Sequence, residues 1–141
     1  MNNAYGKYLK QGVEGASQGQ LIVMMYDAAV RFMKQAIKAI ETKDIEGAHN
    51  NIIRTENIIY ELMSTLNTDK GGEIADNLLK LYDYMIWELV DANTAKSIEK
   101  IENVLKVITP LRSAWKEIVS RDEPKTPAQT EPERKSVSFS G

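Results

Sequence analysis

SQGQLIVMMYDAAVRFMKQAIKAIE, which occupies residues 17–41, carries a helical pattern along its whole length. Its apolar residues recur three and four positions apart, and this spacing gathers them along the side of an α-helix. Ser17 can cap this helix with its hydroxyl group while the Gln20 side chain reaches back to the Ser17 amide, as in a capping box. We therefore predict a long helix over residues 17–41.

The same spacing continues after residue 41 in three further segments, at residues 45–66, 73–92 and about 94–119. No proline precedes Pro110, so nothing interrupts the first three helices. The links at residues 42–44 and 67–72 are short, and short links return the chain antiparallel to the helix before. We expect an all-α fold, an antiparallel up-down four-helix bundle.

The helix ends can also be predicted from single residues. Asp44 is a suitable N-cap for the second helix, and Asn93 or Thr94 for the last one. Pro110 removes a hydrogen bond to the Lys106 carbonyl, so we expect it to kink the last helix or to divide it. In the second case Thr109 caps the new helix.

The two ends of the chain differ in composition from its middle. Residues 1–16 contain three glycines, and residues 122–141 contain three of the four prolines among polar residues. Neither end carries enough apolar side chains to offset the entropy lost on folding. We expect an N-terminal arm or cap at 1–16, a helical bundle at 17–121 and a disordered tail at 122–141.

The composition excludes several classes of protein. The 141 residues are 43% hydrophobic and 27% charged, with a net charge of -2, one histidine and no cysteine. A near-neutral chain without a basic block is a poor candidate for nucleic-acid binding, and one without cysteine forms no disulfide or thiolate site. Neither a signal peptide nor an apolar run long enough for membrane insertion is present. The sequence predicts a cytoplasmic protein.

The helices carry more apolar surface than a bundle requires. In residues 17–41 the apolar side chains cover an arc of roughly 240°, whereas a core-facing stripe needs little more than 100°. The helices at 45–66 and 73–92 each carry a second apolar stripe beside the core stripe. The core stripe of the helix at 73–92 includes Ile74, Leu78 and Leu81. Such surplus predicts a groove for an amphipathic partner segment, although packing under the arm or in a homodimer remains open.

We assign the candidate partner-binding residues to these surplus stripes. They are Ile22, Met25 and Tyr26 in the first helix, Ile53, Asn57, Ile58 and Tyr60 in the second, and Leu79, Tyr82, Ile86 and Val90 in the third.

Enzyme chemistry is not supported by the residues. His49 belongs to a single E-x-x-H unit, whereas a di-iron bundle needs two such units. A histidine phosphotransfer bundle that uses His49 remains an alternative, as does a structural homo-oligomer. The acidic residues form no close inward-facing pair, and Gly71-Gly72 lacks the rest of a phosphate loop. We expect no catalytic residue, no metal, no cofactor and no small-molecule substrate.

Four motifs in order resemble one known family. GEIADNL at 72–78 is followed by LYDYM at 81–85 and by Ala92-Asn93. QLIVMMYD at 20–27 stands in the first helix, NIIYEL at 57–62 in the second and LRSAW at 111–115 in the last. Together they resemble the FliS-type flagellar secretion chaperones over nearly all of the expected bundle.

The resemblance implies a function as well as a fold. Proteins of this family hold the C-terminal segment of flagellin, which is disordered in the free monomer, and deliver it to the cytoplasmic domain of a flagellar export-gate protein of the type III system. Their N-terminal arm lies over part of the flagellin-binding surface, and an arm tyrosine matters for docking at the gate. By position, Tyr5 or Tyr8 would have that role here.

Overall fold

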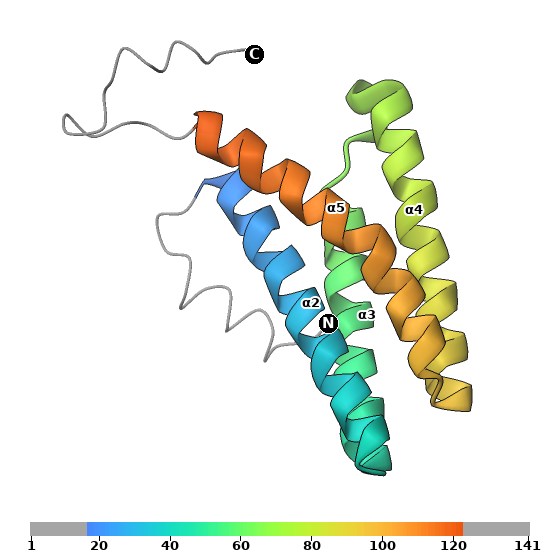
Figure 1. Ribbon diagram of the computed structural model, residues 1–141. Helices are drawn as coiled ribbons and strands as arrows, with labels where there is room; N and C mark the ends of the chain where they lie inside the picture. Colours follow the sequence, from blue (N-terminus) through green and yellow to red (C-terminus); the bar gives the residue numbers. More distant parts are fainter. Residues whose placement is uncertain (1–16, 123–141) are drawn as a thin grey trace, which may run out of the picture.

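The computed structural model describes residues 17–122, which form four long α-helices (Figure 1). They are α2 (Gln18–Glu41), α3 (Ile45–Ser64), α4 (Thr68–Ala95) and α5 (Ile98–Asp122). The helices alternate in direction and form a ring, in which α2 and α4 each pack against both α3 and α5. The predicted all-α antiparallel bundle is confirmed. The predicted arm and tail lie outside the described residues, apart from Asp122.

The first two helices begin as their capping residues predict. The Ser17 hydroxyl accepts a hydrogen bond from the Gln20 amide at 3.1 Å, and the Gln20 side chain accepts one from the Ser17 amide at 2.9 Å. Asp44 caps α3 by accepting a hydrogen bond from the Gly47 amide at 2.9 Å. Both caps satisfy amides that lack partners within the helix.

The start of α4 differs from the prediction. Residues 67–72 are not simply a turn, because α4 begins at Thr68 with Asn67 as its N-cap. The Asn67 side chain accepts a hydrogen bond from the Lys70 amide at 3.0 Å and so supports one helical turn. Gly72, at φ 59° and ψ -136°, then interrupts the helix in a conformation that favours glycine.

The expected start of the last helix is also wrong. Asn93 and Thr94 lie inside α4, which ends at Ala95 with Lys96 in the left-handed region at φ 51°. The cap of α5 is Ser97, whose hydroxyl accepts a hydrogen bond from the Lys100 amide at 3.2 Å. The Asn93 side chain is instead engaged by Lys96 and His49.

Pro110 does not divide α5. The helix continues through this residue as one element of 25 residues, so the predicted division at Thr109 is wrong. Pro110 lies on the exposed side, whereas Ile101, Val104 and Ile108 are fully buried on the other. Packing along this buried side holds the helix together where one backbone hydrogen bond is missing.

A pair of tyrosines lies in the centre of the core. The hydroxyl oxygens of Tyr26 in α2 and Tyr82 in α4 are 2.5 Å apart, and both side chains are almost fully buried. Burial raises the pKa of Tyr26 and of Tyr82 above the ordinary value, and a hydrogen bond with Trp115 of α5 opposes this for the pKa of Tyr26. A polar contact thus joins α2 and α4 inside an apolar core.

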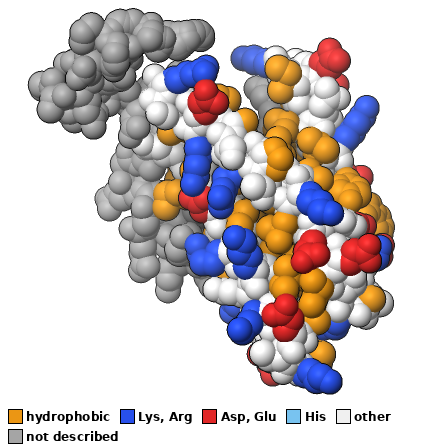
Figure 2. All heavy atoms as spheres, viewed as in Figure 1, with side chains coloured by type: hydrophobic (Ala, Val, Ile, Leu, Met, Phe, Trp, Pro, Cys, Tyr) orange, Lys and Arg blue, Asp and Glu red, His pale blue; other side chains and the backbone are white. Residues whose placement is uncertain are grey.

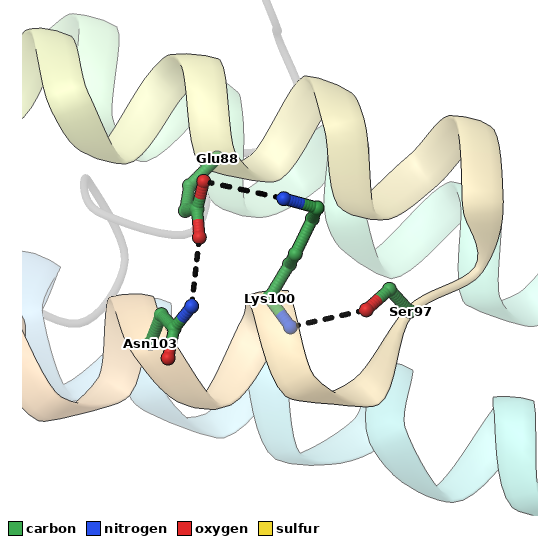
Figure 3. A network of polar contacts seen from close by, with 4 residues as sticks. All are labelled: Glu88, Ser97, Lys100 and Asn103. Atoms are coloured by element: carbon green, nitrogen blue, oxygen red, sulfur yellow. Dashed lines mark hydrogen bonds and ion pairs between the residues drawn. The ribbon is translucent and has the colours of Figure 1, made fainter.

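α5 divides its contacts between two neighbours. Near its start, Asn103 donates a hydrogen bond to Glu88 of α4 at 2.8 Å, and the Lys100 ammonium lies 3.8 Å from the same carboxylate (Figure 3). Near its end it lies over the start of α2 (Figure 1), where a Cβ atom at Gly19 would be only 2.9 Å from Val119. The end of α5 therefore turns away from the start of α4.

This path of α5 corrects one expectation about the core. Ile74 and Leu81, near the start of α4, were expected to be buried, yet their exposed fractions are 73% and 37%. No helix covers the side of α4 that carries Ile74 and Leu81, because the end of α5 packs against α2 and not against the start of α4. Leu78, by contrast, packs against the core as predicted.

Candidate partner-binding surface

The structure separates the predicted partner-binding residues into two groups. Six of them belong to the buried core of the bundle, with exposed fractions of 7% or less. These six are Ile22, Met25, Tyr26, Ile58, Tyr82 and Ile86. They would have to be uncovered before a partner could contact them. That any of them contacts a partner stays a prediction.

The other five are accessible, and they lie on α3 and α4. Ile53, Asn57 and Leu79 are partly buried, whereas Tyr60 and Val90 are exposed. Ile53, Asn57 and Tyr60 follow one another along one face of α3, since they are four and three residues apart. Tyr5 and Tyr8 lie outside the described residues.

An open pocket of about 460 Å³ joins the two helices at one end of this face. Ile53 of α3 and Val90 of α4 supply its apolar sides. The remaining lining residues are polar or charged, namely His49, Glu56, Asn93, Thr94 and Lys96. The pocket therefore combines a small apolar contact area with hydrogen-bonding groups.

Hydrogen bonds fix the polar groups of this pocket. The Lys96 ammonium donates to the backbone oxygen and to Oδ1 of Asn93, at 2.7 and 2.9 Å. Nδ2 of Asn93 is then the donor to Nδ1 of His49 at 2.9 Å, which leaves the ring proton of a neutral His49 on Nε2. Burial raises the pKa of the Glu56 carboxyl, and nearby His49 lowers it.

A second apolar surface lies on the outside of α4, and we call it the outer α4 face. It consists of Ile74, Leu81, Tyr84 and Trp87, of which Ile74 and Trp87 are the most exposed. Figure 2 shows hydrophobic side chains over α4 and toward α5 on the viewed side. Sequence reasoning placed Ile74 and Leu81 in the core stripe and so missed their exposure, which depends on the path of α5.

Residues 17–122 contain neither a candidate membrane-spanning helix nor a candidate metal cluster. No helix there is both long and apolar enough to cross a membrane. No three residues among its histidines and acidic side chains lie close enough to hold a metal ion.

Comparison with known proteins identifies the family. A family model described as "Flagellar protein FliS" matches residues 1–122, which is most of the chain. The chain belongs to the FliS family. Among FliS relatives, the "Flagellar secretion chaperone FliS" of Bacillus subtilis (strain 168) is 34% identical over 122 residues, which cover 86% of this chain and 90% of the relative. The protein of the same description from Salmonella typhimurium is 37% identical over 111 residues, 78% of this chain and 82% of the relative.

A solved structure agrees with the FliS assignment at the level of the fold. The "Crystal structure of flagellar chaperone from bacteria" superimposes with a TM-score of 0.70 and covers 85% of this chain and 98% of the other. Its sequence identity is 16%, so it bears on the fold alone. The named FliS relatives are flagellar secretion chaperones and not enzymes. The family assignment thus favours a chaperone over histidine phosphotransfer by His49.

Proposed function

We propose that this FliS-family chaperone binds the disordered C-terminal segment of flagellin in the cytoplasm, prevents its premature polymerisation and delivers it to the cytoplasmic domain of a flagellar export-gate protein. The observation that supports this most is the apolar side chains left exposed on α3 and α4 of a folded bundle. Exposed apolar surface of this kind marks sites where proteins bind amphipathic helices.

Occupancy alone explains how such a chaperone would act. Segments that polymerise through amphipathic helices cannot meet one another while their apolar faces are covered. Coupled folding and binding of a disordered segment buries on the order of 1,000 to 3,000 Å², and ordering the chain offsets part of the gain. The complex is then specific but reversible, and it needs no nucleotide.

The accessible residues of α3 and α4 are our first choice for the contact with flagellin. Ile53 and Val90 border the pocket, and Tyr60 offers an aromatic ring with an exposed fraction of 52% further along α3. Tyr is among the side chains that contribute most to interfaces when a partner covers them, and burial of the two aliphatic side chains adds a hydrophobic contribution. An amphipathic helix along α3 and α4 would cover all three residues.

The N-terminal arm adds two further parts to the proposal. Residues 1–16 would cover part of the flagellin site in the free chaperone, and Tyr5 or Tyr8 would dock at the export gate. Deleting residues 1–15 should then tighten the affinity for flagellin or leave it unchanged. A large loss of affinity would show that the arm is a direct contact or part of the fold.

Isothermal titration calorimetry with a peptide from the flagellin C-terminus tests the proposal. We expect one peptide per chaperone and a negative heat-capacity change, because apolar surface becomes buried. Absence of binding, with self-association of the chaperone instead, would contradict the function and favour a homo-oligomer.

Two aspartate variants locate the site. Val90→Asp should weaken binding strongly, because it places a charge within the contact. Ile118→Asp on α5 is the matched control, since Ile118 is also an exposed aliphatic residue, at 45% against 37% for Val90. If only Ile118→Asp weakens binding, the contact does not lie on α3 and α4.

A further inference from the structure

The side of the bundle formed by α2 and α5 is basic. α2 contributes Arg31, Lys34 and Lys38, and α5 contributes Arg112 and Lys116; we call these five residues the basic strip. In the ring of helices, the α2–α5 side is opposite the α3–α4 side. Figure 2 shows several blue side chains on the side of the molecule where α2 and the end of α5 lie.

This charge contrasts with the rest of the molecule. The whole chain has a net charge of -2, and α4 alone carries six acidic and two basic side chains. Cations collected on one side of an acidic protein attract an acidic partner to that side and orient it during encounter.

The carboxylate of Asp27 lies beside the strip. Oδ1 of Asp27 lies 3.6 Å from the Arg112 guanidinium and 3.5 Å from the Lys116 ammonium, both too long for strong hydrogen bonds. Among residues 17–122 there is no ion-pair partner for Lys34 or Lys38. Asp27 therefore neutralises the strip only in part, and Lys34 and Lys38 retain capacity for stronger acceptors.

The strip borders a hollow that a side chain can enter. An open pocket of about 390 Å³ is lined by Asp27, Val30, Gln35 and four residues of the strip. Nε of Arg112 is buried there without a hydrogen-bond partner in the described part of the chain. The guanidinium is thus held in place by packing rather than by saturated hydrogen bonds.

The spacing of the cations indicates the shape of the occupant. Lys34 and Lys38 are four residues apart on α2, as are Arg112 and Lys116 on α5. Residues four apart lie one turn apart on the same helix face, so each pair matches carboxylates at the same spacing on another helix. We propose that the basic strip binds an acidic helical segment of a second protein, while the opposite side remains free for flagellin.

An acidic protein fits better than a nucleic acid or a membrane. The strip extends for only about 10 Å along α2, from Arg31 to Lys38, at 1.5 Å per residue. A longer polyanion would extend beyond the strip onto the rest of a chain whose net charge is -2, which disfavours it. A short helix with a few carboxylates avoids that contact.

Fluorescence anisotropy with the full chain tests the proposal. The probe is a labelled alanine-based helical peptide with glutamate at every fourth position, and its control is the same peptide with glutamine. We expect the glutamate peptide to bind, more weakly at higher salt, and the glutamine peptide to bind much less. Failure of the glutamate peptide to bind at low salt would overturn the proposal.

Three variants locate the binding. Lys34→Glu with Lys38→Glu should weaken it about tenfold or more, because two attractions become repulsions. Lys80→Glu with Lys106→Glu changes the net charge equally, outside the strip, and should weaken binding far less. Asp27→Asn should strengthen binding, because it frees Arg112 and Lys116. Equal weakening by both lysine pairs, or no gain with Asp27→Asn, would overturn the proposal.

Two further ligands distinguish other occupants. Phosphatidylserine vesicles and single-stranded oligothymidine should bind more weakly than the glutamate peptide. If either binds more tightly and is lost with the lysine pair of α2, the strip is a lipid or nucleic-acid site, and the proposal is wrong. Circular dichroism of each variant confirms that the bundle is folded.

Discussion

The hydroxyls of Tyr26 and Tyr82 show how single polar atoms position helices in this core. Each hydroxyl is the other's hydrogen-bond partner inside the core. A buried polar group without a partner lowers stability more than a hydrogen bond raises it. The pair therefore favours the one arrangement of α2 and α4 in which the two oxygens meet.

Removing one hydroxyl tests this role. Tyr82→Phe should lower the free energy of unfolding by about 1 to 3 kcal/mol, because it leaves the Tyr26 hydroxyl without this partner. The double variant Tyr26→Phe with Tyr82→Phe should lose less than the sum of the single variants. Urea denaturation gives these values, and Tyr84→Phe, at an exposed position, is the control. Strict additivity would contradict the coupling.

Glu56 gives a prediction about pH. Burial raises the pKa of its carboxyl above the ordinary 4.5, so the folded state disfavours the charged form. The resulting loss of folding stability is fully present above the raised pKa, and it disappears as the pH falls below the ordinary pKa of 4.5. Glu56→Gln should therefore raise the free energy of unfolding at pH 7, and the gain should shrink toward pH 4.

Urea denaturation at both pH values measures the effect of Glu56→Gln. The same substitution at Glu61, on the same helix, is the control. A gain of equal size at pH 7 and at pH 4 would mean that the carboxylate charge is not its cause.

At the scale of elements, local rules predicted helix starts where one turn of sequence contains all the interacting groups. Ser17 with Gln20, and Asp44 with Gly47, are of this kind. The same rules failed at Asn93 and Thr94, because several residues there can cap a helix and the contacts with α3 and α5 decide among them. Lys96 ends α4 instead, in the left-handed region.

Gly72 gives a prediction at this scale. A Cβ atom there would meet nothing within 4 Å, so any loss of stability on substitution comes from the backbone alone. Gly72→Ala should lower the free energy of unfolding by about 1 to 3 kcal/mol, because φ is positive. D-alanine at this position, introduced by chemical synthesis, should be tolerated, since its mirror-image backbone lies in the extended region. Equal losses with both residues would contradict a conformational cause.

At the scale of the whole molecule, the sequence predicted the number and direction of the helices but not the path of α5. Periodicity placed Ile74 with the core residues of α4, because the pattern gives the angular position of a side chain around the helix axis. It does not show which other helix, if any, packs against that position. It likewise counted Ile22 and Met25 as surplus, although α3 and α5 cover most of α2. Of the candidate partner-binding residues within 17–122, those outside the core lie on α3 and α4.

Two truncations to alanine compare positions that periodicity treats alike. Leu89→Ala should lower the free energy of unfolding by about 2 to 5 kcal/mol, because Leu89 is fully buried. Ile74→Ala should change it by no more than about 0.5 kcal/mol, since most of Ile74 is in water. Thermal or urea unfolding distinguishes the two. A loss above 1 kcal/mol at Ile74 would show that this end of α4 is covered in solution.

The exposure of Trp87 has a practical consequence. Trp87 is 64% exposed, so we expect its fluorescence to be that of an indole in water. Trp115, the other tryptophan of the chain, packs against the core. The protein thus contains two intrinsic fluorophores in different environments. In the Trp115→Phe variant, the emission wavelength of Trp87 reports whether a partner binds to the outer α4 face. In the Trp87→Phe variant, the emission wavelength of Trp115 reports whether α2 and α5 remain packed against each other.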